Sequence, residues 1–567
     1  MLSSLLALFT ISPRNIQPPL SPFRPLPNAF ANNTDYFNFE DMTVTVAKPL
    51  VELEMTQLSA ALREKDLWWT KFQNEEIMAK WRVEAIQQAK LMKPSHVDYV
   101  LQELDGYAKL RDEATGAEVG CYDKIWQSDK LIPLSLKQRL IDGVAKLENI
   151  PDSEKDWHPR SNHQVLDLVH PSLYPIVYER TLAYYGDAPD PQQRRLRAIP
   201  VPPVVEAHDK YECFVCDEHK NYHLSYQFQW LPTDFEVSKD GKSVKSVSYI
   251  NNLNPGVHLD LHHTLEDVVA KFVPLFERVL TDSIPENAAV PQRVPNEYSY
   301  NETYAPKPEW SYSLDGDENE AVYQVWAKNR PYLGPEVDPR GYQLGSLEHR
   351  RFNYTLVGKT IQVIVKLANI HLTPEKPAYP GGSWHIEGMS NEAIAVSGIY
   401  YYDEDNISES RLAFRTATAS PMNYEQGDER GCRLTWGIGP DGPCVNELGS
   451  IRTLQDRTIA FPNIYQHQVS PFELKDKSRP GHRKILALFL VDPAIHRPST
   501  TTVPPQQQDW HISPNPDLGP DFLTRVEGVM SRREAENYRL ELMNERTAFV
   551  KENNDKFFSV AFSMCEH

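Results

Sequence analysis

The stretch Ser383-Trp-His-Ile-Glu-Gly-Met-Ser-Asn-Glu-Ala-Ile-Ala-Val-Ser-Gly-Ile-Tyr-Tyr-Tyr402 joins a polar motif to an apolar run. His385 and Glu387 follow a loop rich in Pro and Gly and precede residues 393–402, whose composition is typical of a buried strand. In an extended segment, the side chains of residues i and i+2 point to the same side. We therefore expect His385 and Glu387 to reach one metal ion together at the start of a core strand.

A second histidine and a late arginine complete this pattern. His467 follows an expected strand, and Arg483 precedes the apolar run 485–491. Two imidazoles and one carboxylate occupy one face of an octahedron and leave three positions open, which is typical of non-haem Fe(II) oxygenases. A planar guanidinium suits two-point binding of a carboxylate. The pattern predicts that His385, Glu387 and His467 hold Fe(II), and that Arg483 holds the distal carboxylate of a 2-oxoglutarate cosubstrate.

Four further residues near these motifs are candidates for the walls of a substrate pocket: Trp384, Tyr400, Tyr402 and Arg411. Aromatic residues on strands are more often part of the core, and that alternative stays open. The alternative to a metal site is that His385 and Glu387 are merely a pair of solvent-exposed surface residues. The alternative to cosubstrate binding by Arg483 is that this residue forms an ion pair on the protein surface, beside its basic neighbours.

Two other groups resemble metal sites. His258-Leu-Asp260, with His262 and His263 nearby, leads into an expected helix, so we interpret it as polar residues at a helix start. Cys213-Phe-Val-Cys216 lies close to His219 and His223. Structural zinc sites usually take pairs of ligands from separated segments, so we interpret these as buried cysteines beside solvent-facing histidines.

Length, charge and cysteine content limit the class of protein. The chain has 567 residues and a net charge of −19, which argues against nucleic-acid binding. Its six cysteines do not make a disulfide framework, so a reducing compartment, the cytoplasm, is expected. No apolar run approaches the roughly 18–20 residues that cross a bilayer. The first residues lack the basic start of a signal peptide, and membrane association is not expected.

The chain divides into five expected segments: a Pro-rich arm (1–40), a mainly helical region (41–225), a core (226–498) with an insert (281–345), a linker (499–520) and a C-terminal helix (521–567). Helices are predicted at 51–62, 67–90, 96–112, 134–148 and 265–280. Strands are predicted at 222–231, 361–370, 393–402, 411–416, 457–461 and 485–492, with a hairpin turn at Asp240-Gly241. Short strands between Gly/Pro loops favour a jelly-roll type of double sheet.

Several motifs resemble those of a fungal family catalogued as domain of unknown function 4246. They are Pro374-Glu-Lys-Pro-Ala-Tyr-Pro-Gly-Gly-Ser-Trp-His-Ile-Glu-Gly-Met389, Gly481-His-Arg-Lys-Ile-Leu-Ala-Leu-Phe-Leu-Val-Asp-Pro493, Tyr400-Tyr-Tyr-Asp403, Asn406-Ile-Ser-Glu-Ser-Arg411, Lys155-Asp-Trp-His-Pro-Arg-Ser-Asn162 and Val165-Leu-Asp-Leu-Val-His-Pro-Ser-Leu173. The resemblance implies a fold similar to the cupin-like, double-stranded β-helix oxygenases. Most such enzymes have Asp where this chain has Glu387, and Ser where it has Ile485, so the second contact to the cosubstrate carboxylate is not assigned.

The sequence thus predicts an α+β protein. A double-stranded β-helix (jelly-roll, cupin-like) core carries a helical N-terminal region and a C-terminal helix. The predicted function is that of an Fe(II)- and 2-oxoglutarate-dependent dioxygenase, an oxidoreductase acting on a small molecule or a substrate of unknown class. Two alternatives stay open: a cupin-type metal dioxygenase without a cosubstrate, and a non-enzymatic interaction scaffold. Neither the substrate nor the oligomeric state is predicted.

Overall fold

The computed structural model describes most of the chain. The described residues are 26–27, 46–185, 195–203, 222–287, 293–295, 308–329, 332–421, 424, 428–511 and 527–564.

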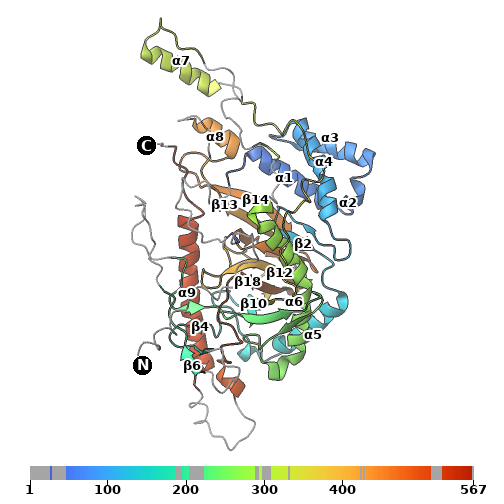
Figure 1. Ribbon diagram of the computed structural model, residues 1–567, viewed down its shortest axis with the longest axis vertical. Coiled ribbons are helices and arrows are strands. Elements are labelled where there is room, and N and C mark those ends of the chain that lie inside the picture. The colour runs from blue at the N-terminus through green and yellow to red at the C-terminus, as the bar shows by residue number, and fades with distance from the viewer. Residues whose placement is uncertain are drawn as a thin grey trace, which may run out of the picture.

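A large antiparallel sheet forms the centre of the molecule (Figure 1). Its strands lie in the order β1 (Glu118–Val119), β2 (Trp126–Ser128), β15 (Thr458–Pro462), β12 (Ile394–Asp405), β18 (Gly481–Val491), β10 (Thr360–Leu372), β8 (Thr233–Val237) and β9 (Val244–Ser246), and β3 (Val165–Val169) pairs with β10 as well. The long apolar strands β10, β12 and β18 lie side by side at its middle, because strands buried on both faces have the most apolar sequences.

A smaller sheet places β13 (Arg411–Ala417) between β14 (Val445–Arg452) and β16 (Gln466–Val469). Along the chain the strands change sheets: β12 belongs to the large sheet, β13 and β14 to the small one, β15 to the large one, β16 to the small one and β18 to the large one. Three two-stranded sheets lie at the edges: β11 (Ala378–Tyr379) with β17 (Phe472–Glu473), β4 (Ile176–Val177) with β7 (Phe228–Gln229), and β5 (Leu182–Tyr185) with β6 (Arg195–Ala198).

Helices lie on both sides of these sheets (Figure 1). The long helix α6 (Pro255–Ser283) crosses one side, and α9 (Arg532–Lys556) lies on the opposite side. The other helices are α1 (Leu50–Arg63), α2 (Trp68–Lys71), α3 (Glu75–Gln88), α4 (Pro94–Leu110), α5 (Leu134–Glu148), α7 (Gly316–Asn329) and α8 (Glu429–Trp436), with short 3-10 turns at Asp152–Glu154, Pro285–Asn287 and Gln508–His511.

The alternation of β12 decides which of its side chains meet α6. Tyr400 and Tyr402 belong to the main core, which also contains Phe272 and Phe276 of α6. Tyr401 belongs to a separate core with Phe414 of the small sheet. Successive residues of a strand point to opposite faces, so β12 supplies one layer to the helix and another to the space between the sheets.

Most predicted elements are confirmed, with three corrections. The predicted helix 67–90 is two helices, α2 and α3, because the side chain of Asn74 accepts a hydrogen bond from the amide of Ile77 and starts a new helix. Helix α6 begins at Pro255 rather than 265, with Asn254 as its cap. Of the predicted strand 222–231, only Phe228–Gln229 pairs. The hairpin at Asp240-Gly241 joins β8 and β9 as predicted.

The first part of the segment interpreted as a linker is packed onto the body of the molecule. Val503, Gln506 and Gln507 are buried, and the amide of Thr500 donates to the carbonyl of Pro232. The insert at 281–345 contains the helix α7.

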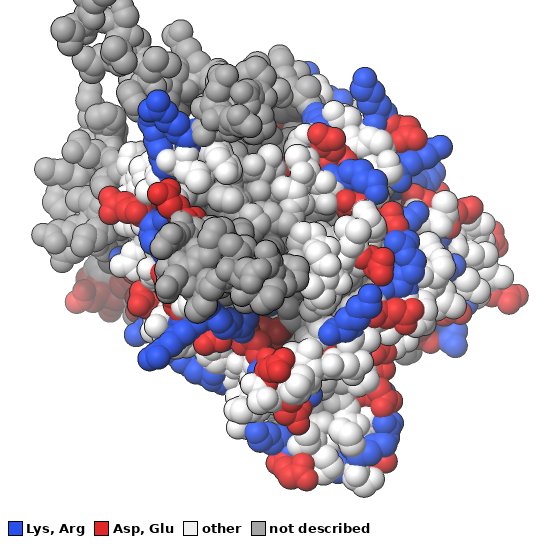
Figure 2. Space-filling model, turned by 90° about the horizontal axis from the view of Figure 1, so that it is seen from below, with Lys and Arg blue, Asp and Glu red and all other residues white. Residues whose placement is uncertain are grey.

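The surface carries charges of both signs. On the face seen in Figure 2, acidic and basic side chains of the described residues lie interspersed. Within the described part of the chain, no helix is long and apolar enough to cross a membrane.

Candidate functional site

His385 and His467 are paired through their backbones. The amide of His385 donates to the carbonyl of His467 (3.2 Å), and the amide of His467 donates to the carbonyl of His385 (3.0 Å). Residues that face each other across an antiparallel pair place their side chains on the same side. The two imidazole rings accordingly lie with their centroids 4.3 Å apart.

The glycines before this pair bring the two segments together. Gly381 has φ of +88°, and a Cβ atom there would lie 2.7 Å from the carbonyl oxygen of Val469. The amide of Gly382 donates to that same oxygen (3.0 Å), and the side chain of Gln468 donates to the carbonyl of Gly382 (2.8 Å). Only glycine combines this conformation with so close an approach.

Asn463 holds the backbone of Glu387 at both of its polar groups. The Asn463 side chain accepts from the Glu387 amide (2.9 Å) and donates to the Glu387 carbonyl (2.8 Å). Between the two candidate ligands, Ile386 points the other way, into a cluster with Phe549 of α9. The i, i+2 alternation predicted for His385 and Glu387 is therefore present.

The three predicted ligands come together. One possible ligand atom from each of His385, Glu387 and His467 lies within 4.8 Å of the other two. Oε1 of Glu387 is 3.6 Å from Nε2 of His385 and 3.4 Å from Nε2 of His467. One carboxylate oxygen thus faces one nitrogen of each ring, as a shared metal ion would require.

Burial and mutual charge set the ionisation of the group. Burial acts to raise the pKa of Glu387, yet hydrogen bonds and charge interactions with both histidines hold this pKa well below its usual value. Burial lowers the pKa of His467 to about 4, and the charge of His385 adds to the effect. Burial opposes protonation of His385 too, but its hydrogen bond to Glu387 raises this pKa. The carboxylate is therefore ionised, and the His467 imidazole is neutral at pH 7.

The tautomer of His385 suits a metal ligand. Its Nδ1 lies 2.8 Å from the carbonyl oxygen of Ser383, which can only accept, so Nδ1 carries a proton and Nε2 is the nitrogen that can bind a metal once its own proton is lost. Metal-binding histidines usually donate their second nitrogen in this way. His467 packs edge-on against Phe461, and its buried Nδ1 has no hydrogen-bond partner among the described residues. These residues fit a divalent metal ion.

Arg483 is buried, and the hydrogen bonds of its side chain go to residues other than the three candidate ligands. Its side chain is 1% exposed. It donates to the hydroxyl of Ser410 (3.1 Å), the carboxylate of Glu404 (3.2 Å) and the carbonyl of Thr453 (3.2 Å). Its Nε has no partner among the described residues. Because Arg483 is buried, the alternative of an ion pair on the protein surface is excluded.

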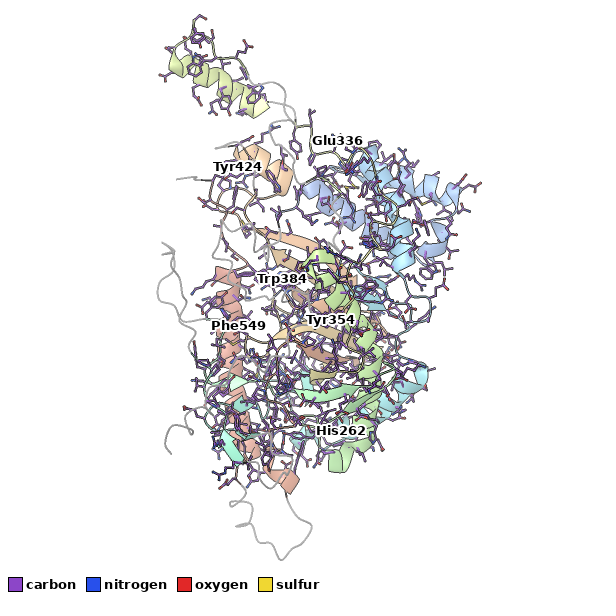
Figure 3. All side chains as sticks on the ribbon, viewed as in Figure 1. His262, Glu336, Tyr354, Trp384, Tyr424 and Phe549 are labelled. Atoms are coloured by element: carbon purple, nitrogen blue, oxygen red, sulfur yellow. The ribbon has the colours of Figure 1, made fainter. Side chains whose placement is uncertain are left out.

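The four predicted wall residues separate into different environments. Trp384 precedes the first histidine and lies beside α9 (Figure 3), where the guanidinium of Arg415 stacks over its ring at 4.7 Å. Tyr400 and Tyr402 face the core under α6, away from the small sheet. Arg411 pairs with Glu64 (2.7 Å). The structure thus keeps Trp384 next to the first histidine, places Tyr400 and Tyr402 in the main core, and engages Arg411 in an ion pair with Glu64.

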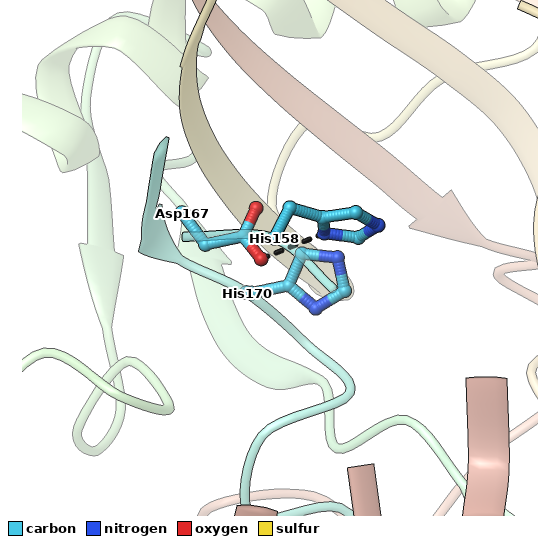
Figure 4. A group of neighbouring side chains, drawn as sticks. All are labelled: His158, Asp167 and His170. Carbon is cyan, nitrogen blue, oxygen red and sulfur yellow. Dashed lines mark hydrogen bonds and ion pairs between the residues drawn. The ribbon is translucent and has the colours of Figure 1, made fainter. Parts of the chain in front are cut away.

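A second group of the same composition comes from the motifs at 155–162 and 165–173. His158, Asp167 and His170 have potential ligand atoms within 4.8 Å of one another (Figure 4). Nδ1 of His158 donates to Asp167 (2.8 Å). The amide of Ser172 donates to Nδ1 of His170 (3.2 Å), so the proton of this ring lies on Nε2. The guanidinium of Arg539 also lies 3.8 Å from the carboxylate of Asp167. The potential ligand atoms of this group are thus already engaged by hydrogen bonds and by the cation of Arg539.

Neither of the other motif groups forms a described metal site. His258 and Asp260 lie inside α6 rather than before it, which corrects the predicted helix start. Nε2 of His262 donates to the carbonyl of Leu253 in the interior, and His263 pairs with Glu266 (3.2 Å). Cys213, Cys216 and His219 lie outside the described residues.

Sequence reasoning missed two residues of this region. Asn463 was part of the motif before His467, but its role depends on a contact 76 positions away in the chain. Lys366 is a half-buried lysine on the apolar strand β10, and its charge lowers the pKa of His467. A lone charged residue inside an apolar strand was the available signal for Lys366.

The fold is a mixed α/β arrangement of antiparallel sheets and helices, and its candidate site is a group of two histidines and one carboxylate. The chain belongs to the family described as a protein of unknown function, DUF4246, whose model matches residues 94–513. The model of that family's N-terminal domain matches residues 11–84. This confirms the family resemblance seen in the motifs. No curated protein matches the chain.

The solved structures that match the chain include three of low identity. The Fe(II)/(alpha)ketoglutarate-dependent dioxygenase TqaL is 11% identical with a TM-score of 0.20, and the match covers 46% of this chain and 65% of TqaL. IDO from Bacillus thuringiensis is 12% identical (TM-score 0.16; 28% and 69% covered). A bsmA homolog from Methylobium petroleophilum is 8% identical (TM-score 0.23; 64% and 86% covered). Likeness this low carries no argument about the fold or activity of this chain.

Proposed function

We propose that the chain is a non-haem oxygenase that uses Fe(II) and 2-oxoglutarate, built on a double-stranded β-helix. The strand order supports this core, because the chain passes from the large sheet to the small one and back twice between β12 and β18. That exchange is the property by which a jelly roll differs from a simple meander. The bridge between His385 and His467 adds one more strand pair beside β13.

The observation that carries the proposed function is the convergence of His385, Glu387 and His467, with Nδ1 of His385 held by the carbonyl of Ser383 so that Nε2 faces the carboxylate. Bound Fe(II) and 2-oxoglutarate would supply the oxidation of a substrate C–H bond. The protein groups would bind and orient. Glu387 offers a charged oxygen, His467 offers a neutral nitrogen, and His385 offers Nε2 once that nitrogen is deprotonated. Asn463 keeps the carboxylate segment in position.

Arg483 is the proposed anchor of the distal carboxylate of 2-oxoglutarate. Its burial supports this role, since a desolvated guanidinium binds a carboxylate more strongly than an exposed one does. Glu404 already lies 3.2 Å from the guanidinium. The cosubstrate would therefore have to compete with Glu404 for Arg483.

The proposed compartment is the cytoplasm, and the proposed partner is a small-molecule substrate. The described cysteines Cys121, Cys432 and Cys444 are buried and free, as is usual where thiols stay reduced.

Anaerobic Fe(II) titration tests the metal site. The wild-type protein should bind one Fe(II) at this site, and His385→Ala or His467→Ala should lose it, because two remaining ligands rarely hold Fe(II). His263→Ala is the matched control, a histidine already engaged by Glu266 on α6. Full Fe(II) occupancy in His385→Ala would exclude the assignment and favour the interaction scaffold.

Anaerobic titration with 2-oxoglutarate, followed by the metal-to-ligand charge-transfer band, tests the cosubstrate. Arg483→Ala should keep Fe(II) but weaken 2-oxoglutarate binding by about 2–5 kcal/mol, roughly 30-fold or more. Arg483→Lys should restore only part of the affinity, because a point charge lacks the two-point geometry. Glu404→Gln should strengthen binding by removing the competitor. If 2-oxoglutarate has no effect on metal-loaded wild type, the cupin-type dioxygenase is the better explanation.

A further inference from the structure

Lys366 lies in the middle of β10, the apolar strand that pairs with β18. Lys366 is half-buried, and its neighbours Val365 and Leu367 belong to the main core under α6. No hydrogen bond or ion pair joins its side chain to another residue in the described part of the chain. A lysine without a partner inside a sheet is uncommon, because removing a charge from water costs free energy unless the charge is paired. Packing alone therefore does not explain this residue.

Lys366 faces the space between the two sheets. Residues directly opposite each other in an antiparallel sheet place their side chains on the same face. Lys366 is opposite Ala487 of β18, which is opposite Ile399 of β12. Ile399 belongs to the core between the sheets, together with Phe461, the ring against which His467 packs. Lys366 thus lies on the face of the large sheet that is turned toward the candidate site.

The positive charge of Lys366 acts on the candidate ligands themselves. Burial is the largest influence that lowers the pKa of His385 and of His467, and the charge of Lys366 acts in the same direction on both. The side chain of His385 is 32% exposed and that of Glu387 is 15% exposed, so a ligand from solvent can reach this group. Register, charge and access therefore all place the ammonium group of Lys366 beside an open site.

Asp167 does not neutralise this charge. It lies opposite Ala368, two residues along β10 from Lys366. Its Oδ2 is 2.8 Å from Nδ1 of His158 (Figure 4) and 3.8 Å from the guanidinium of Arg539, and it forms no ion pair with Lys366. The ammonium group of Lys366 is therefore available to an anionic ligand.

The place of Arg483 indicates which anion this ligand is. Arg483 is opposite Ile370, which is four residues along β10 from Lys366, a separation of roughly 13 Å in a strand. In the proposed function, Arg483 holds the distal carboxylate of 2-oxoglutarate, and the candidate ligands hold the metal ion to which its oxoacid end binds. Both ends of the cosubstrate then have their partners, and Lys366 is left for a second molecule.

We propose that Lys366 binds a carboxylate of the substrate, so that the substrate of this site is a small carboxylic acid. This inference rests on the proposed oxygenase function. An ammonium group donates charge-assisted hydrogen bonds to a carboxylate and accepts none, which selects an acid over an alcohol or an amine. Lys366 would act as a positioning residue that holds the acid group beside His385 and His467. The alternative is a lysine whose ammonium group only reaches out to solvent.

Saturation-transfer NMR on the metal-free full chain tests the binding of an acid by Lys366 without any metal. Butyrate should give a signal, whereas 1-butanol and butylamine, of similar size, should give little. Lys366→Met, which keeps the length of the side chain without its charge, should weaken butyrate binding at least tenfold, and Lys366→Arg should retain part of it. Arg483→Ala should leave it unchanged. The matched control is Lys484→Met, a lysine of the neighbouring strand that Glu148 already engages (3.0 Å).

A paramagnetic metal tests where the acid lies. In protein loaded with Mn(II) and saturated with 2-oxoglutarate, the proton signals of butyrate should broaden, because the acid group sits next to the metal site. His385→Ala should abolish the broadening but keep butyrate binding. If the chain binds neither metal nor 2-oxoglutarate, the proposed function fails, and the measurements on metal-free protein still decide the role of Lys366.

Four results would overturn the proposal. The first is the absence of a butyrate signal in the wild-type protein, or an equal signal from 1-butanol. The second is butyrate binding that is unchanged in Lys366→Met. The third is displacement of butyrate by 2-oxoglutarate, which would make Lys366 a contact of the cosubstrate. The fourth is bound butyrate that Mn(II) does not broaden in the wild-type protein, a result that does not depend on the folding of any variant.

Discussion

A single proton distinguishes the two groups of two histidines and one carboxylate. In the group at His385, the carbonyl of Ser383 accepts a hydrogen bond from Nδ1, so Nε2 is the nitrogen that faces the carboxylate. In the group at His170, a backbone amide occupies Nδ1 and leaves the proton on Nε2. Similar composition therefore supports different chemistry, and neighbouring backbone groups decide which.

Asn463 gives a prediction about a residue that touches no metal. Asn463→Ala removes both hydrogen bonds to the backbone of Glu387, so the carboxylate should lose its fixed position. Fe(II) affinity should fall about 10–100-fold, as expected for a supporting residue behind a ligand. Anaerobic Fe(II) titration measures this change. Asn406→Ala is the control, since Asn406 also holds backbone groups but at the loop of Asp476. An equal loss in both variants would contradict the role of Asn463.

Asp167 predicts a pH-dependent contribution to stability. Burial opposes its ionisation, but the charge of His170 and the hydrogen bond from His158 lower its pKa from 3.8 to about 2. A carboxyl group with a lowered pKa stabilises the fold above its unfolded pKa, and this contribution is lost as the pH falls toward 2. The contribution is about 2 kcal/mol at neutral pH.

Asp167→Asn should therefore be less stable than wild type at pH 7, and the difference should shrink between pH 4 and pH 2. Urea unfolding at a series of pH values measures the difference in the free energy of unfolding. Asp142→Asn, on the exposed side of α5, should show no such trend. A difference that is constant with pH would mean that Asp167 has an ordinary pKa in the folded state.

At the scale of secondary-structure elements, apolar periodicity predicted where the strands lie, but not which neighbours their side chains contact. The predicted strands at 361–370, 393–402 and 411–416 match β10, β12 and β13. Tyr400 and Tyr402 share a face because they are two residues apart, yet their sequence does not say whether that face meets α6 or the small sheet. The environment of the Arg411 side chain depends on its ion pair with Glu64, which comes from the N-terminal region. The metal motif was predictable because its two local ligands, at i and i+2, lie on the same side of one short segment.

The contact between α6 and the large sheet depends on a glycine. A Cβ atom at Gly398 would lie 2.9 Å from the rings of Phe272 and Phe276. Gly398→Ala should therefore force the helix away from β12 and cost about 1–3 kcal/mol, as overpacking does. Gly316→Ala, where a Cβ atom meets nothing within 4 Å, should cost nothing and gain a little helix propensity. Thermal unfolding of both variants measures the difference. Equal stability of the two would mean that α6 does not press on Gly398.

At the scale of the whole molecule, the terminal helices are tied to the sheets by contacts that no local pattern reveals. Arg546 of α9 pairs with the buried Glu392 (2.6 Å), which also accepts from the amides of Trp230 and Met389. Asn554 of α9 donates to the carbonyl of Trp384 beside the first histidine. The C-terminal helix therefore supports the candidate site from outside, a relation that becomes visible only in the folded chain.

The N-terminal helices depend in the same way on one buried arginine. Arg293 is 1% exposed and binds Glu52 of α1 (3.1 Å) and Glu103 of α4 (2.8 Å). Arg293→Met would leave two buried carboxylates without their cation, and breaking a buried pair costs about 3–5 kcal/mol. Because 1.4 kcal/mol is a factor of ten, local opening of α1 and α4 should become at least a hundredfold more frequent.

Hydrogen exchange read by mass spectrometry should show this change as faster exchange in α1 and α4, with β12 and β18 unaffected. Arg340→Met removes an exposed pair with Asp338 and should change nothing, since solvent screens the attraction between exposed charges. Replacing Glu52 and Glu103 by Gln in the Arg293→Met background should restore part of the protection, because it removes the uncompensated charges. Faster exchange throughout the sheet would instead mean that the helical region and the core unfold as one unit.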